Sequence, residues 1–253
     1  MTTQTRVPLR AEWTKFHTVR SLPWLAVIAV LVSVLMALLF VMSLPITQGT
    51  AVAALPSTTV VEAALLGVDV AMIVLIVMGA SFAGSEYATG LAQLTFVLTP
   101  RRGRVVLAKL AVTGAVAAVV GAVAATLCTF VGQLMVVSAA PLEAALVRLA
   151  AGSVLTAVFY ALVAVAAALV VRSTGGGVVT ALALLALPTV LHWIPGLDAA
   201  APLLPSAALH GISGASEPGQ AEFLSAATAI GSLIAWTVLI GAVAVWRVAS
   251  RDV

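Results

Sequence analysis

The sequence is poor in charged residues. Asp, Glu, Lys and Arg make up only 8% of the 253 positions, whereas a soluble domain carries roughly a quarter. Hydrophobic residues reach 62% and the mean hydropathy is +1.20, which excludes a soluble globular protein. The apolar stretches are continuous in Ala, Val and Leu and do not alternate, so they favour transmembrane helices over a closed barrel. We therefore predict an all-α, polytopic membrane protein.

Cysteine is nearly absent, and so are nucleotide and metal motifs. Cys128 is the single cysteine, which excludes an intrachain disulfide and indicates a small buried apolar side chain. The glycines at 175–177 lack the lysine that follows the phosphate-binding loop of nucleotide-binding proteins, so we expect a turn there. His192 and His210 have no Cys, Asp or Glu cluster at metal spacing. We expect no metal and no cofactor in this chain.

One short motif is typical of an enzyme. The residues from Gly211 to Gly214 match the G-x-S-G of rhomboid intramembrane proteases, which start a helix with the serine and activate it with a histidine from a later span. No histidine follows Ser213, so we predict that the chain is not an enzyme. The other candidates for convergent titratable groups are Asp69, Glu143 and Arg148.

The apolar stretches predict six spans in a single transmembrane domain, residues 1–253. The third stretch has about 33 residues, or about 50 Å of helix, against a hydrocarbon core of about 30 Å. It contains no turn-forming residues, so we expect one tilted helix. Residues 194–222 contain several prolines and are expected to form short helices that dip back toward the membrane. The expected spans are about 23–44, 60–82, 105–137, 146–171, 178–193 and 223–246.

The first span is expected to be retained, because 24–44 is longer than the apolar region of a signal peptide. Of the 12 Lys and Arg residues, all but Arg148 lie on one side of a six-span arrangement. Basic residues concentrate on the cytoplasmic side of membrane proteins. Both termini are therefore predicted to be cytoplasmic, in the plasma membrane and, from the Ala, Val and Arg usage, of a bacterium.

Residues 1–22 are predicted to form an interfacial helix. A helix that starts near Pro8 places Leu9, Trp13 and Phe16 on one face and basic residues on another. Such a helix lies in the plane of the lipid headgroups. The alternative is a basic flank that only fixes orientation.

Asp69 lies inside the second span, where an unpaired carboxylate costs about 2.5–3.5 kcal/mol. It is either a polar point on a substrate path or a packing residue that is protonated or hydrogen-bonded. The sequence leaves both readings open.

The stretch from Ser85 to Lys109 is the one long break between apolar stretches that combines polar, turn-forming and clustered basic residues. Its leucines at 91, 94 and 98 share one helical face, so we expect a short amphipathic helix parallel to the membrane. Lys109 is expected to snorkel to the cytoplasmic surface. Glu86 is a carboxylate that could receive a basic group of a partner protein. Alternatively, the basic residues at 101–104 only anchor the loop to anionic phospholipid.

The six spans and the segment GSEYATGLAQLTFVLTPRRGRVVLAK resemble the permease subunits of ABC-2-type ATP-binding cassette transporters, which have the type V exporter fold. In that family a Glu followed by Gly opens the first cytoplasmic loop, a coupling helix docks on the ATPase, and Pro-Arg leads into span three. The resemblance implies an ATPase-binding site with Arg104 and Lys109 as neighbours. Its residues would be Glu86, Tyr87, Gly90, Leu94, Pro100, Arg101 and Arg102.

The resemblance also implies a dimer, either a homodimer or a heterodimer with a second permease, that exports a substrate. The chain carries no fused ATPase domain, so ATP and Mg²⁺ would be bound by a separate cytoplasmic ATPase subunit. Membrane lipids are expected partners, and nucleic acid is not. A membrane scaffold or immunity-type protein would share the composition and differ in binding no ATPase.

Overall fold

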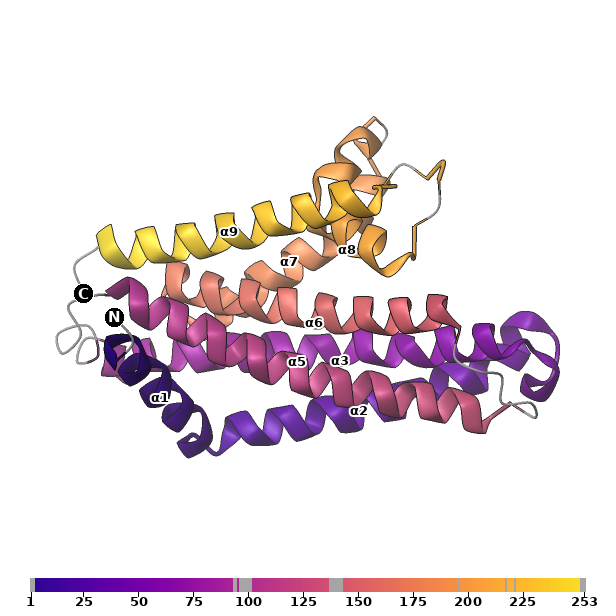
Figure 1. The fold of residues 1–253 in the computed structure, drawn as a ribbon, viewed down its shortest axis with the longest axis horizontal. Coiled ribbons are helices and arrows are strands. Elements are labelled where there is room, and N and C mark those ends of the chain that lie inside the picture. Colours follow the sequence, from indigo (N-terminus) through magenta and orange to yellow (C-terminus); the bar gives the residue numbers. More distant parts are fainter. Residues whose placement is uncertain are drawn as a thin grey trace.

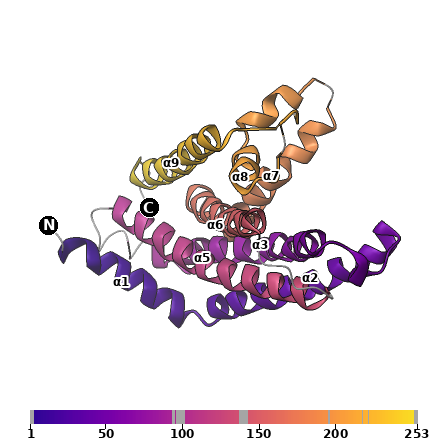
Figure 2. The same ribbon diagram turned by 45° about the vertical axis from the view of Figure 1, so that its right-hand side comes forward.

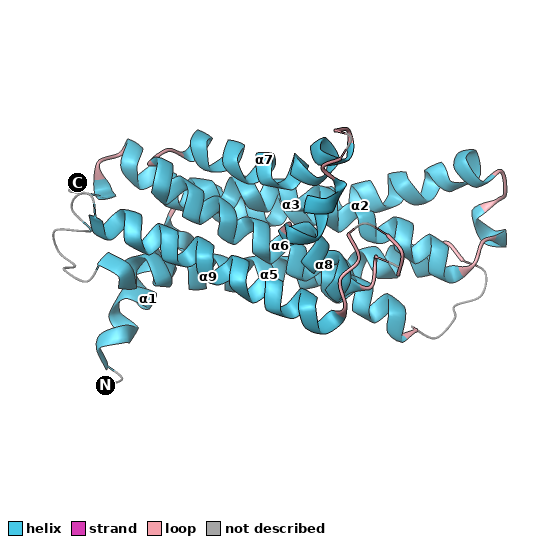
Figure 3. Ribbon diagram, turned by 90° about the horizontal axis from the view of Figure 1, so that it is seen from above, coloured by secondary structure: helices cyan, strands magenta, loops and turns pink. Residues whose placement is uncertain are grey.

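The computed structural model describes residues 3–92, 95, 102–136, 143–194, 196–216, 218–220 and 222–250. Within these residues the chain is helical (Figure 1; Figure 3). Two 3₁₀ segments are also described, η1 (Val52–Ala54) between α2 and α3 and η2 (Asp198–Leu203) between α7 and α8. The α-helices are α1 (Thr3–Thr18), α2 (Ser21–Gln48), α3 (Ser57–Ala88), α5 (Arg102–Leu134), α6 (Ala144–Val171), α7 (Thr174–His192), α8 (Pro205–Ser213) and α9 (Ala226–Ser250).

Six of the described helices, α2, α3, α5, α6, α7 and α9, are long and apolar enough to cross a membrane. This confirms the predicted all-α fold with six spans. The third span is one helix, as predicted. A helix satisfies its own backbone hydrogen bonds, which is required where no water is present. The chain is therefore a multi-pass membrane protein.

Both termini lie at the same end of the bundle (Figure 1). We call this end, which holds α1, the last turns of α3 and α9 and the first turn of α5, the basic end. Arg148 lies near the start of α6, toward the opposite end, where η1 joins α2 to α3. Among the described residues, Arg102, Arg104 and Lys109 of α5 and Arg247 of α9 lie at the basic end, and the orientation in a membrane stays a prediction.

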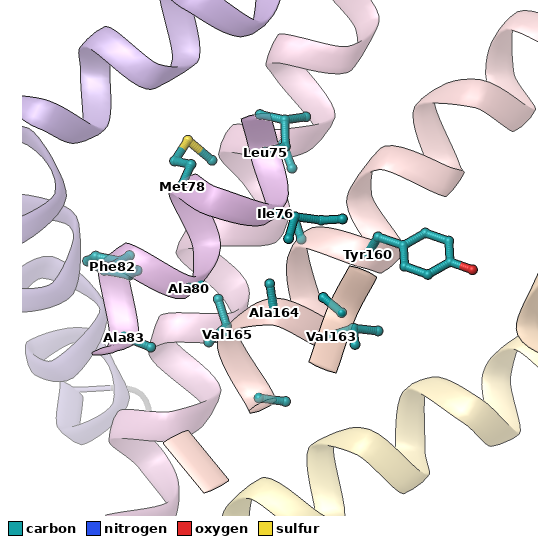
Figure 4. Packing of buried hydrophobic residues seen from close by; sticks show 14 of the residues in the cluster. Leu75, Ile76, Met78, Ala80, Phe82, Ala83, Tyr160, Val163, Ala164 and Val165 are labelled. Carbon is teal, nitrogen blue, oxygen red and sulfur yellow. The ribbon is translucent and has the colours of Figure 1, made fainter. Parts of the chain in front are cut away.

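Helices α3 and α6 form the centre of the bundle, and most of each is buried. Figure 4 shows Ile76 of α3 facing Tyr160 and Val163 of α6 in one buried cluster. Gly79 of α3 allows this close approach, since a Cβ there would lie 2.7 Å from a backbone oxygen of α6. Small residues let membrane helices pack at short distance.

Helices α2, α7 and α9 are peripheral and expose most of their surface. α7 and α9 both pack against α6 and flank it on different sides (Figure 2). α5 contacts α2, α3, α6 and α9. The bundle therefore has a buried centre, and its outer helices pack on that centre with one face and expose the rest; α2 packs extensively on α3.

The segment between α7 and α9 contains short helices, as predicted. α8 packs against α6 and α9, and Gly152 of α6 lies directly against Ser213 at its end. Prolines begin α8 at residue 205 and interrupt η2 at residue 202. The predicted depth of these helices in the membrane stays a prediction.

The expected turn at 175–177 is wrong, because those glycines form the first turn of α7. The reversal occurs earlier, at Arg172, which has a φ of 58° and ends α6. The hydroxyl of Ser173 then accepts a hydrogen bond from the Gly176 N–H at 3.3 Å and caps α7. Gly177 allows the close packing of α7 on α6, since a Cβ there would lie 2.7 Å from the Ala168 Cβ.

Candidate functional site

The inward face of α1 is charged. Glu12 and Phe16 are buried and Lys15 is half-buried, whereas Leu9 and Trp13 are exposed. Residues three and four apart share a helix face, so these three side chains meet the bundle together. Trp13 and Phe16 lie side by side, with ring centroids 6.5 Å apart, but Phe16 is buried against the bundle whereas Leu9 and Trp13 are exposed.

Glu12 and Lys15 meet Glu86 at the end of α3 and Lys109 in α5; we call these four residues the charged cluster. Lys109 Nζ lies 2.6 Å from Glu12 Oε2 and 2.8 Å from Glu86 Oε1. Lys15 Nζ lies 2.7 Å from Glu12 Oε1 and 3.0 Å from Glu86 Oε1. Each carboxylate thus accepts from both amines, which are hydrogen bonds of the strong, charge-assisted kind. The cluster ties together α1, α3 and α5.

Lys109 is the buried centre of the cluster. Its side chain is only 1% exposed, and its amine lies 4.4 Å from the centroid of the Phe82 ring. Phe82 in turn makes an edge contact with Phe16 of α1, at 5.6 Å between ring centroids. The expectation that Lys109 snorkels to the surface is wrong, because two carboxylates and an aromatic face compensate its charge inside the protein.

The formal charges of the cluster cancel. Burial lowers the pKa of Lys15, but the hydrogen bond to Glu12 and the charges of Glu86 and Glu12 outweigh it, so the pKa lies above its ordinary value. Lys15 Nζ also lies 3.4 Å from the hydroxyl of Thr95, a helical residue in the segment between α3 and α5. The more open side of the cluster therefore reaches this segment.

The site residues that the resemblance implied are only partly brought together. Glu86 and Tyr87 lie in the last turn of α3, and Gly90, with a φ of 74°, follows the helix end. Arg102 begins α5 and donates to the Val248 carbonyl of α9 at 3.4 Å. Leu94, Pro100 and Arg101 lie outside the described residues, as does most of the predicted coupling helix.

Glu86 does not present its carboxylate to the outside. The residue is 8% exposed, and both of its lysine partners belong to this chain. This corrects the expectation of an open carboxylate for a partner's basic group. A role of the surrounding loop in binding an ATPase stays a prediction.

Of the other polar candidates, Arg148 and Ser213 line one cavity, whereas Glu143 and Asp69 are not among its lining residues. Arg148 Nε and Nη2 donate to the carbonyls of Ile212 and Gly211, at 2.7 and 2.6 Å, and so bind the end of α8. Ser213 ends α8, and its hydroxyl accepts from the Ala215 N–H at 3.3 Å. Glu143 is the exposed residue that precedes α6. These contacts are structural and do not resemble an activated nucleophile.

Asp69 is half-buried in the middle of α3. His210 of α8 has its Nδ1 3.0 Å from Glu222 Oε1. Within the described parts of the chain, no three His, Cys, Asp or Glu side chains group as metal ligands do. The two readings of Asp69 stay open.

Sequence reasoning missed Glu12 and assigned Lys15 only to orientation. The available signal was the spacing of Glu12, Lys15 and Phe16. An acidic residue in a basic segment indicates a buried ion pair when it shares a helical face with an aromatic residue.

No family model, no curated protein and no solved structure matches the chain.

Proposed function

We propose that the chain is the permease subunit of an ATP-binding cassette transporter, coupled to a separate cytoplasmic ATPase and exporting its substrate as a dimer. The observation that carries the proposal is the charged cluster. It joins the N-terminal helix to the two helices that enter and leave the loop at residues 89–101.

The position of the cluster suits the transmission of force. Glu86 precedes the loop and Lys109 follows it, so their ion pair links the two ends of the loop. A partner that pushes on the loop would move α3 and α5 together and shift α1 with them. α3 lies at the centre of the bundle and contacts α2, α5, α6 and α7, so its tilt would be passed to the membrane pathway.

The resemblance of residues 84–109 to ABC-2-type permeases supports the same proposal. Arg102 is exposed in part and lies at the start of α5, where a cytoplasmic subunit could contact it. ATP and Mg²⁺ would be bound by that subunit, and hydrolysis would be its chemistry.

The test is purification of the tagged, full-length protein from its native membranes in mild detergent, with measurement of co-purifying polypeptides and of ATP hydrolysis. We expect a stoichiometric ATPase. Arg102→Glu should reduce the amount of bound ATPase. Arg20→Glu, which reverses an exposed charge outside the predicted site, should retain it.

Absence of an ATPase from an intact, folded preparation would contradict the proposal and favour the scaffold or immunity-type protein. Equal retention of ATPase by both variants would contradict the assignment of Arg102 to the contact. Far-UV circular dichroism and the elution volume of each variant establish that the bundle is intact.

A further inference from the structure

A cavity of about 740 Å³ lies between the first turns of α3, the first turns of α6 and the end of α8; we call it the polar cavity. α3 lines it with Glu62 and Leu66, which are four residues apart on one side of that helix. α6 lines it with Ala145 and Arg148. Because both helices begin where the chain is farthest from its termini, the polar cavity lies toward the end of the bundle opposite the basic end (Figure 1).

Glu62 is the negative charge of the polar cavity. It makes no ion pair and no side-chain hydrogen bond with any other described residue. The residue is exposed although it lines the cavity. Its carboxylate is therefore open to whatever occupies the cavity.

Arg148 lines the same cavity but is directed at the protein. Its Nε and Nη2 donate to the carbonyls of Ile212 and Gly211, and a Cβ at Gly214 would lie 3.3 Å from its Cζ. The guanidinium thus packs on the end of α8, where a helix carries partial negative charge. This contact compensates the helix end and leaves Glu62 without a partner.

The segments that connect the helices at this end carry an excess of negative charge. Residues 49–62, 135–149 and 193–225 contain five Asp and Glu but only one Lys or Arg, which is Arg148. An excess of one sign around a cavity raises the local concentration of ions of the opposite sign. The surroundings of the polar cavity therefore favour a cation.

The rest of the wall is largely apolar and is not fully covered by protein. Leu66 is 47% exposed, and Ala63 and Leu149 also line the cavity. Binding sites for small molecules have volumes of about 300–1,000 Å³ and combine apolar walls with a few polar groups that orient the ligand. The polar cavity has this size and this composition.

We propose that the polar cavity binds an amphipathic organic cation, with its positive group at the Glu62 carboxylate and its apolar body against Leu66 and Leu149. An anion of the same shape would be repelled by Glu62 and would find Arg148 already bound to α8. A zwitterionic phospholipid would bring a phosphate into an end that already has an excess of negative charge. Binding needs no ATPase, so the inference is independent of the proposed function.

The chain offers two matched pairs of variants. Glu62→Gln and Glu143→Gln each remove one negative charge at the same end, but Glu143 does not line the polar cavity. Ala145→Phe places a ring in the cavity, whereas Ala144→Phe makes the same change one residue away, outside the lining. All four positions are exposed, so we expect the variants to fold like the parent.

The experiment is equilibrium dialysis of the purified full chain in dodecyl maltoside against tetraphenylphosphonium, with tetraphenylborate as an anion of the same size and shape. Protein-free micelles correct for partition into detergent. We expect the parent to bind tetraphenylphosphonium saturably and more tightly than tetraphenylborate. Glu62→Gln should weaken this binding about fivefold, the upper value for an exposed ion pair, and Glu143→Gln should match the parent. Ala145→Phe should weaken it at least about tenfold, and Ala144→Phe should not.

Equal binding of the two ions by the parent would refute selection by charge. Equal binding of tetraphenylphosphonium by Glu62→Gln and Glu143→Gln would refute Glu62 as its partner, and equal binding by the two alanine variants would refute the cavity as its place. Absence of saturable binding by a folded, monodisperse parent would overturn the whole proposal.

Discussion

Removing the charge of Lys109 should destabilise the protein strongly. In Lys109→Met the side chain keeps its length, but Glu12 and Glu86 lose their buried partner and share Lys15 alone. The side chains of these carboxylates are 3% and 10% exposed. Breaking a buried pair by removing one partner costs about 3–5 kcal/mol, because the other charge is left uncompensated.

Lys15→Met is the matched control. It removes the same charge from the same two carboxylates, but 36% of its side chain is exposed to solvent. Exposed ion pairs contribute about 0.2–1 kcal/mol. The free energy of unfolding, measured by SDS titration in mixed micelles with far-UV circular dichroism, should therefore fall several times more in Lys109→Met than in Lys15→Met.

A double-mutant cycle tests whether charge is the cause. Glu12→Gln combined with Lys109→Met restores a neutral cluster, so the double variant should lose about 0.5–3 kcal/mol less than the sum of the two single variants. Strict additivity would refute the reasoning. An equal loss of unfolding free energy in Lys109→Met and Lys15→Met would show that burial does not determine how much each amine contributes to stability.

Four further outcomes follow from the structure. The stability that Lys15 contributes should be fully present below its ordinary pKa of 10.5 and lost as pH rises through its higher folded-state pKa, so thermal unfolding of the parent and of Lys15→Met should converge at strongly alkaline pH. Tyr160→Phe should be neutral or stabilising by up to about 1–3 kcal/mol in the same SDS titration, because its buried hydroxyl has no hydrogen-bond partner among the described residues. Gly79→Val should destabilise by about 1–3 kcal/mol in that titration through overpacking against α6, with Gly231→Val close to neutral. Arg148→Gln should leave the bundle intact but speed hydrogen exchange of the last turn of α8, and unchanged exchange there would contradict its role in holding that helix.

Composition and hydropathy are sufficient to predict the fold class, because few backbone structures are stable inside a bilayer. A long continuous apolar stretch has to be helical to satisfy its backbone, so six spans and the single third helix follow directly. Several helices, among them α2 and α3, extend further than the apolar stretches, whereas α9 begins three residues later than predicted. α3 continues through Glu86 and Tyr87, because a helix can include polar residues once they are compensated by packing.

The charged cluster could not be predicted in the same way. Lys109 was assigned to the surface on the evidence of its neighbours, whereas its partner Glu12 is 97 residues away. Local patterns report which residues could face lipid or water, but a buried ion pair depends on which helices meet. The prediction of a turn at 175–177 failed for a related reason, since Gly177 is required by the approach of α7 to α6.

The two faces of α1 differ in exposure and charge. Its outward side carries Leu9 and Trp13, while its inward side holds Glu12 and Lys15 against α3 and α5. Partial separation of α1 would leave Lys109 and Glu86 paired with each other but would strip Lys109 of its shortest hydrogen bond, at 2.6 Å. Buried polar networks that are only half satisfied are worse than none, so docking of α1 should be cooperative. An element that is either fully docked or fully released is the kind that a force on the neighbouring loop can switch.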